Sequence, residues 1–483
     1  MRLSAGAWNA LWYPEIKKHP LLVSHPLAGT GCVSCHQPWA DLAPLACPVR
    51  QCRSSGWRAQ SATPNDGTLR FNPLPVKTQD ASFTSSAPAT CPVVLAGFAA
   101  FANFYVTQPL LPLFTSIFHA GKVSVSLTLT ASTAGVALAA PFVGRLADRF
   151  GRRRIILFSA WALAVTTFLA ATSPGLSALI AWRFLQGLLT PGLFAVTVAY
   201  INDEWPARSA GRAVSAYVSG TVVGGFVGRM MGGFAAEHLD WRYAFVLPGC
   251  LLLAISLILT LTLRQERRRA SASQEGGLLV PAWQHLRNRR LLAVYMAGFC
   301  VLFTLVGMFT YVGFHLSAPP FSLGPSKLGS IFFVYLVGAV MTPLFGRYID
   351  RYGHRSGIVA GSALSIAGAL ITLGGSLWMV LAGLAICCTG VFTAQTAASS
   401  FIGVAARQNR ALAVGLYVTF YYIGGSAGST LPGWLWRAAG WPGCVGLVIF
   451  MQAMLMLIAR YGWQSGSLPA GSREAGVEIP QGC

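Results

Sequence analysis

A positively charged side chain stands inside one of the apolar stretches of this sequence. The stretch contains Trp182-Arg183-Phe-Leu-Gln186-Gly187, and Arg183 lies about two helical turns from the start of the segment 176–200. A cation inside a bilayer costs about 3 kcal/mol or more, so it normally faces a bundle interior or a wet cavity. Arg183 and Gln186 are therefore candidates for a transport pathway. The alternative is a structural arginine that reaches toward the membrane surface.

The carboxylates are the other groups that would bind a cation or a proton, and none of the fourteen falls in the middle of an apolar stretch. Four precede residue 91, two follow residue 462, and the others stand in loops or at the ends of apolar stretches. A carrier of cationic molecules would usually keep an acid in its cavity. The sequence therefore favours a neutral or anionic substrate.

Arg229 is the only other cation that we place within an apolar segment. It follows the start of the segment 211–235 by 18 residues, so we expect it near the outer end of a helix, reaching toward Glu237 or Asp240. A lone membrane histidine either titrates in a cavity or packs through hydrogen bonds, and both alternatives stay open for His315. The further polar candidates for the pathway are Tyr105, Gln108, Tyr311 and His315.

One motif points to another class of protein. Cys32-Val-Ser-Cys35-His36 has the form of a covalent haem attachment site, and Cys47 and Cys52 follow at a spacing that loosely suggests zinc. No apolar helices surround this motif to enclose a haem. The sequence has no phosphate-binding loop with Lys-Ser/Thr, and its membrane part has no credible catalytic triad or metal-ligand cluster. We expect no enzyme, no catalytic residue, no cofactor and no resident metal.

A membrane-embedded scaffold must position these residues. The chain has 483 residues, of which 54% are hydrophobic and 10% charged, with a mean hydropathy of +0.56. A soluble chain would have roughly a quarter charged residues, which argues against a cytosolic enzyme. The composition predicts an all-α, polytopic membrane protein with twelve spans. The predicted spans cover residues 92–118, 123–147, 154–172, 176–200, 211–235, 241–263, 291–317, 326–349, 356–375, 376–404, 410–435 and 441–462.

The net charge of +21 would suggest a nucleic-acid partner in a soluble domain, but here the basic residues gather in alternate loops. One set of loops, with the central linker and the C-terminal tail, holds 21 arginines. The other set holds only Lys122, Arg242, Lys327 and Arg437. This bias predicts that both termini and the linker are cytoplasmic and that no nucleic acid is bound.

The longest internal polar stretch divides the membrane part into two halves of six spans. The opening residues lack a cleavable signal and a core-forming pattern, so we expect a disordered extension there, which an artefactual start of the sequence would also explain. The predicted organisation is an extension (1–91), a first half (92–263), a basic linker (264–290), a second half (291–462) and a tail (463–483).

An internal repeat relates the halves. Gly144-Arg-Leu-Ala-Asp148-Arg149-Phe-Gly151-Arg-Arg153 is matched 202 residues later by Gly346-Arg-Tyr-Ile-Asp350-Arg351-Tyr-Gly353-His-Arg355. A second echo relates glycines of the fifth and eleventh spans at an offset of 204. These helix-packing glycines are Gly220, Gly224, Gly225, Gly228, Gly424 and Gly428. The repeat predicts two pseudo-symmetric halves.

The G-x-x-x-D-R-x-G-x-R loop resembles the signature of the major facilitator superfamily, and the resemblance covers about residues 92–462. It implies two six-helix halves around a central cavity, with access that alternates by rocking. It also implies that the loop latches the halves on the cytoplasmic side, with Asp148 as a switch residue. From the residues themselves, Gly144 would allow close helix approach and Gly151 a tight turn. The alternative is a basic loop that only sets topology.

Within the superfamily, Asn103-Phe-Tyr-Val-Thr-Gln108-Pro109-Leu-Leu-Pro112 and Gly224-Gly-Phe-Val-Gly228-Arg229 look like the drug and sugar efflux permeases of the arabinose-efflux or YnfM type. Antiporters of that group carry Gly-x-x-x-Gly-Pro-x-x-Gly-Gly in the fifth span. This sequence has Gly225 in place of the proline and Arg229 in place of the last glycine. The R-x-x-Q-G pattern at Arg183 is tied, by the same resemblance, to proton coupling or transport.

These observations predict a monomeric secondary transporter of the bacterial inner membrane, which exports small organic molecules in exchange for protons. A facilitator or importer of sugars or organic anions is the alternative in mechanism. Alternatives of another class are a membrane receptor or scaffold, which would show no flux, and a haem-bearing redox protein, which would show a haem absorption band.

Overall fold

The computed structural model describes residues 89–266, 279–405 and 410–463, and every regular element in these ranges is a helix. The Cys32 motif, most of the predicted extension and linker, and the tail beyond Trp463 lie outside the described residues. The elements are α1 (Cys91–Phe104), η2 (Gln108–Leu110), α2 (Leu111–Ile117), α3 (Lys122–Phe150), α4 (Arg152–Ala171), α5 (Leu176–Glu204), α6 (Ala207–His238), α7 (Tyr243–Thr262), α8 (Leu279–Arg287), α9 (Arg289–Ser317), α10 (Pro325–Ile331), α11 (Val334–Tyr352), α12 (His354–Ile371), α13 (Leu377–Ala405), α14 (Arg410–Thr430) and α15 (Pro432–Gly462).

The predicted all-α class is confirmed. Within the described residues, eight helical segments are long and apolar enough to cross a membrane, or nine if α10 and α11 form one bent span. Helices α6, α12 and α14 coincide with three further predicted spans but do not belong to that set. The count of twelve therefore stays a prediction.

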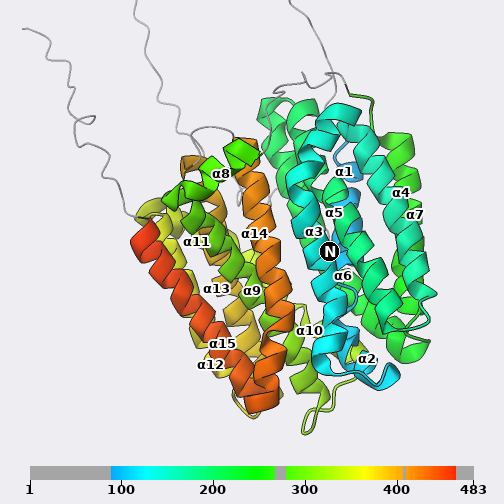
Figure 1. The fold of residues 1–483 in the computed structure, drawn as a ribbon, viewed down its shortest axis with the longest axis vertical. Helices are drawn as coiled ribbons and strands as arrows, with labels where there is room; N and C mark the ends of the chain where they lie inside the picture. The colour runs from blue at the N-terminus through cyan, green and yellow to red at the C-terminus, as the bar shows by residue number, and fades with distance from the viewer. Residues whose placement is uncertain (1–88, 267–278, 406–409, 464–483) are drawn as a thin grey trace, which may run out of the picture. The chain divides into compact units, whose positions relative to one another are not determined.

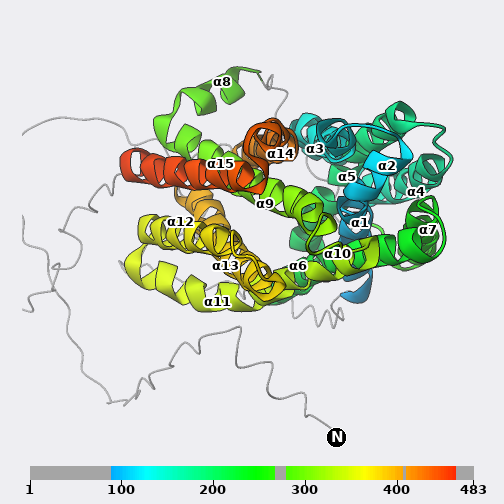
Figure 2. The ribbon, with the colours of Figure 1, turned by 90° about the horizontal axis from the view of Figure 1, so that it is seen from below.

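Two groups of helices lie beside each other (Figures 1 and 2). Helices α1 to α7 form the first, and α9 with α11 to α15 form the second. Helix α3 packs against α14, and α6 packs against α10. We call this boundary the seam. We call the end of the helices that carries Asp148 and Asp350 the motif end, and the end that carries Lys122 and Pro325 the opposite end.

Glycines bring two pairs of helices into backbone contact, one pair in each group. A Cβ atom added at Gly224 or Gly228 would collide with the carbonyl oxygens of Phe98 or Ala102 in α1. In the second group, Gly424 and Gly428 lie against the carbonyl oxygens of Phe299 and Phe303 in α9. Such close approach replaces hydrophobic burial as the main source of helix association in a bilayer.

The backbone contacts relate the glycines of the two halves at a different residue offset from the one that the sequence suggests. Gly224 and Gly228 correspond to Gly424 and Gly428 at an offset of 200 residues, since 428 − 228 = 200, and the offset of 204 is wrong. The error arose because a four-residue glycine spacing looks the same when it is shifted by one helical turn. The partner helix fixes the register.

We predict that Gly228→Leu prevents normal packing of α6 on α1. The side chain would occupy the space of the Ala102 backbone, which cannot move away as a flexible side chain would. We expect a lower thermal midpoint and less monodisperse protein in detergent, measured by fluorescence-detected size exclusion after heating. The matched control is Gly446→Ala in α15, where an added Cβ meets no atom within 4 Å. Equal melting of both variants would contradict this prediction.

Candidate functional site

Two arginines are buried inside the helical bundle. Arg183 in α5 is 0% exposed and Arg229 in α6 is 1% exposed. Among the described residues, neither forms an ion pair with a carboxylate. An isolated buried charge is costly unless neutral groups or a counter-ion compensate it. The partners of these two side chains therefore define the candidate site.

The first predicted span is broken at its centre. Helix α1 ends at Phe104, and the chain resumes helical form in η2, where Pro109 occupies the first turn. The N–H of Gln108 donates to the carbonyl oxygen of Tyr105 over 3.1 Å rather than to that of Phe104, so the ladder changes to the tighter 3₁₀ pattern and carbonyl groups at the end of α1 need other donors. The break places Tyr105 and Gln108 inside the bundle, where both are buried.

Arg183 hydrogen-bonds the end of the broken helix. Its Nη1 atom donates to the carbonyl oxygen of Asn103 over 3.2 Å, and its Nη2 atom donates to the carbonyl oxygen of Phe104. Nη1 also donates to Oε1 of Gln186, whose Nε2 donates to the carbonyl oxygen of Thr166 over 3.1 Å. The predicted pair Arg183 and Gln186 thus lies together and stabilises the negative end of α1.

Gln108 joins three parts of the chain. Its Nε2 atom donates to Oγ1 of Thr310 in α9 over 3.2 Å, and its Oε1 atom accepts from Nε of Arg229 over 2.8 Å. Gln108 therefore connects η2 with α6 and, across the seam, with α9.

Arg229 lies in a cage of rings from both halves. Its guanidinium carbon is 4.2 Å from the ring centroid of Tyr105, 4.4 Å from that of Phe332 and 4.9 Å from that of Tyr335. Nη1 donates to the carbonyl oxygen of Gly225 over 2.6 Å. Cation–π contacts compensate part of the cost of burying the charge. We call Tyr105, Gln108, Arg229, Phe332 and Tyr335 the Arg229 cage.

The expectation that Arg229 reaches toward the membrane surface is wrong. Glu237 instead accepts from the backbone N–H of Ser326 over 2.7 Å, and Asp240 accepts from the N–H of Arg242 over 2.9 Å. The sequence contained a signal, because the two departures from the antiporter pattern stand four residues apart on one helix face. An added Cβ at Gly225 would lie 3.2 Å from Nη1 of Arg229, so glycine there leaves room for the guanidinium.

Aromatic rings that sequence reasoning did not select extend from this cage. The ring centroids of Phe104 and Tyr105 are 4.8 Å apart, and those of Phe104 and Tyr422 are 5.8 Å apart. Tyr422 also lies 6.1 Å from Phe194. These residues belong to both halves, so the centre of the seam has flat apolar surfaces beside a buried cation.

Tyr311 and His315 make their contacts elsewhere. The Tyr311 hydroxyl donates to the carbonyl oxygens of Ser429 over 3.0 Å and Thr430 over 3.3 Å. The His315 ring stacks on Trp441 with a centroid distance of 5.3 Å. These two predicted pathway residues thus pack against α14 and α15 rather than joining the Arg229 cage.

The halves also meet through small polar side chains. Oγ1 of Thr130 lies 2.7 Å from Oγ of Ser429 and 2.8 Å from Oγ1 of Thr430, while Thr133 pairs with Ser426 at 2.8 Å. Nearer the opposite end, an added Cβ at Gly233 in α6 would collide with the backbone of Pro325. Contacts across the seam therefore continue from its centre to the opposite end.

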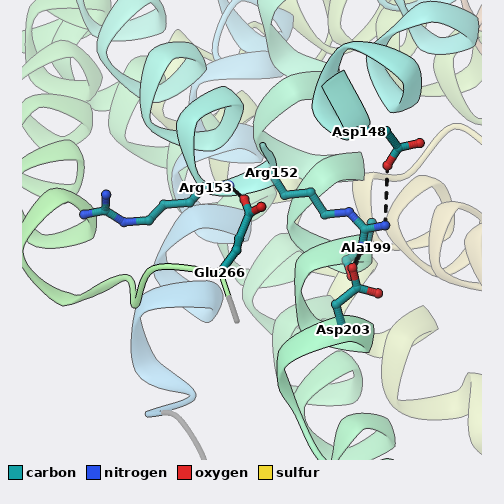
Figure 3. Close-up of polar contacts among 6 residues, drawn as sticks. All are labelled: Asp148, Arg152, Arg153, Ala199, Asp203 and Glu266. Atoms are coloured by element: carbon teal, nitrogen blue, oxygen red, sulfur yellow. Dashed lines mark hydrogen bonds and ion pairs between the residues drawn. The ribbon is translucent and has the colours of Figure 1, made fainter. Parts of the chain in front are cut away.

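At the motif end, the loop residues bind partners of their own half (Figure 3). Arg152 is 3.6 Å from Asp148, pairs with Asp203, and donates to the carbonyl oxygen of Ala199 over 2.6 Å. Arg153 lies on the other side, where its backbone N–H donates to Glu266 at the start of the linker. In this conformation, these contacts do not join the motif to the second half.

The glycines of the two loops differ in what requires them. Gly151 and Gly353 end their helices with φ of 95° and 86°, values that favour glycine because a side chain would be strained there. At Gly144 and Gly346, an added Cβ would meet no atom within 4 Å. The close helix approach expected at Gly144 is thus absent here. Arg149 and Arg351 lie over the rings of Phe150 and Tyr352, at 5.5 and 5.3 Å.

The sequence profile of the Major Facilitator Superfamily matches residues 93–340 and 314–477. The chain belongs to this superfamily. It is 33% identical over 386 residues to an MFS-type transporter of Bacillus subtilis, YybF, a match that covers 79% of this chain and 95% of the relative. It is 30% identical over 364 residues to the inner membrane transport protein YnfM of Escherichia coli, covering 75% and 87%.

Solved structures show the same major facilitator fold. A bacterial homologue of the human lysosomal transporter Spinster, in an inward-facing and unoccupied conformation, matches with a TM-score of 0.62 and 17% identity, covering 77% of this chain and 96% of the other. The predicted family and fold are confirmed. This major facilitator protein is a multi-pass membrane protein of a transporter family.

We predict that Arg183→Ala lowers stability and transport together. Two carbonyl groups of the broken helix would lose their donor, and each unsatisfied buried group costs about 1–3 kcal/mol. Arg183→Lys should fall between wild type and Arg183→Ala, because it keeps the charge but loses the planar fork of donors. Thermal melting in detergent and flux at matched expression measure both effects. If Arg183→Ala keeps the thermal stability and the flux of wild type, the carbonyl oxygens of Asn103 and Phe104 do not need this donor.

We predict that Asp148→Asn impairs transport severalfold without affecting folding. The Asp148 side chain is half exposed and its ion pair with Arg152 spans 3.6 Å, so it contributes little to stability. The matched control is Asp240→Asn, since Asp240 has similar exposure and the same 3.6 Å separation from Arg242. Flux in proteoliposomes and size-exclusion profiles distinguish the variants. If both transport equally well, the loop only sets topology.

Proposed function

We propose that this protein exports small organic molecules across the bacterial inner membrane in exchange for protons, by alternating access. It would work as a monomer in the lipid bilayer, with both termini and the linker on the cytoplasmic side. Its relatives support this proposal, because they include an inner membrane transport protein at 30% identity. A multidrug transporter of Candida glabrata is 29% identical over 154 residues, which cover 32% of this chain.

The observation that carries the proposal is the position of the polar contacts across the seam. Thr130, Thr133 and Glu237 bind the second half from the centre to the opposite end, whereas the hydrogen bonds of Arg152 and Arg153 at the motif end go to the first half and the linker start. Toward the motif end, α3 and α14 still approach each other, since an added Cβ at Gly415 would lie 3.9 Å from Cα of Pro141. One state of a rocking transporter requires bonds between the halves at one end of the seam. We assign this conformation to the state that opens toward the cytoplasm.

Glu237 holds the contact nearest the opposite end. Its exposed carboxylate accepts from the N–H of Ser326 in α10, across the seam.

The test uses inverted membrane vesicles and a panel of organic compounds. Uptake into vesicles should rise when respiration acidifies the lumen, and a protonophore should abolish the rise. Vesicles without the protein give the background.

Other outcomes would contradict the proposal in different ways. Flux that follows only the gradient of the compound would indicate a facilitator. The absence of flux for every compound would favour a receptor or scaffold with the same fold.

A further inference from the structure

The Arg229 cage contains a charge that the described residues do not neutralise. Arg229 is 1% exposed, its hydrogen bonds go to the uncharged oxygens of Gln108 and Gly225, and it forms no ion pair. Its Nη2 atom is buried and has no hydrogen-bond partner among the described residues. A guanidinium group forms its strongest hydrogen bonds with carboxylates and phosphates. An anionic group is therefore the partner that this atom would bind most strongly.

The cage also joins the two halves. Tyr105, Gln108 and Arg229 come from the first half, and Phe332 and Tyr335 come from the second. A ligand here would touch both halves, so its arrival would change their mutual contacts. This is the requirement for a substrate that drives rocking, because a ligand shifts a conformational equilibrium only through unequal contacts in the two states.

The aromatic rings around the cage indicate what the rest of a bound ligand would be. The ring centroids of Phe332 and Tyr335 are 5.5 Å apart, and those of Phe309 and Tyr335 are 4.5 Å apart. On the first-half side, Phe104 packs edge-on against Tyr105. Aromatic side chains bind flat apolar groups by stacking and edge-to-face contact.

We propose that the Arg229 cage binds the anionic group of an organic substrate whose remaining part is flat and apolar, such as an aromatic carboxylate. This inference rests on the proposed transport function and names its substrate class. The carboxylate takes the unpartnered Nη2 and displaces a ring contact of Phe332 or Tyr335. The hydrophobic part of the ligand lies against the released aromatic surfaces. A role limited to helix packing would give no preference for charged ligands.

Binding is tested with 2-naphthoate and with 2-naphthamide, a neutral analogue of nearly the same size. The purified full-length protein in detergent is titrated, and affinity is read from thermal stabilisation and tryptophan fluorescence. Wild type should bind the carboxylate about tenfold more tightly than the amide, because only the carboxylate is itself charged and forms an ion pair with the guanidinium. Equal affinities in wild type would overturn the proposal without reference to any variant.

Variants test whether Arg229 causes the preference for the carboxylate over the amide. Arg229→Gln should reduce the affinity ratio to about one, whereas Arg229→Lys should keep most of it as a point charge. The matched control is Arg242→Gln, since Arg242 is exposed and also lies over a ring, that of Trp241, at 4.7 Å. Retention of the full ratio in folded Arg229→Gln would place the anion elsewhere and overturn the assignment.

Flux in proteoliposomes separates this inference from the proposed function. Transport of panel compounds without preference for anions would leave the transporter proposal intact and refute the substrate class. Arg229-dependent binding of 2-naphthoate without any flux would support the anion site and refute the transport proposal.

Discussion

The break in the first span is the constraint on which the rest of the site depends. Backbone groups inside a bilayer must find hydrogen-bond partners within the protein, because no water is there to replace them. The α-helical ladder ends at Phe104 and changes to 3₁₀ bonds before Pro109, and Arg183 binds the carbonyl oxygens of Asn103 and Phe104 that are left without helical donors. The buried cation of α5 and the end of α1 therefore stabilise each other. The side chain of Gln108, in the 3₁₀ segment, meets both α6 and α9.

The second buried cation depends on that arrangement. Arg229 binds the amide oxygen of Gln108 and lies over the ring of Tyr105, both of which belong to the segment around the break. Gly225 supplies the remaining hydrogen bond and the space, since an added Cβ would crowd the guanidinium. The two departures from the antiporter pattern thus act as a pair. In place of a proline and a glycine, this span holds a fixed positive charge at the seam.

The sequence predicted the features that the membrane itself imposes. Hydropathy located the helices, and short-range spacing placed Arg183 beside Gln186, because residues three apart on a helix share a face. The sequence does not place Arg229, because its partners lie in η2, just after α10 and in α11, and Phe332 and Tyr335 look like ordinary apolar residues of a span. The register of the glycine pairs failed for the same reason. It depends on which carbonyl of α1 or α9 faces each glycine, which spacing within α6 and α14 does not specify.

The two halves share a helical frame but place different side chains at the seam. The frame repeats, as the glycine contacts of α6 with α1 and of α14 with α9 show. The buried arginines come from α5 and α6 of the first half, and the second half meets Arg229 with uncharged rings. If the seam opens as proposed, the hydroxyl pairs between α3 and α14 can exchange for water, since a water bridge replaces a neutral hydrogen bond at little cost. The contacts of Arg229 would not exchange so easily, because separating the rings would leave a buried charge with less compensation. In the proposed mechanism, opening the seam at this level would require a new partner for that charge, and this is the role that we propose for an anionic ligand.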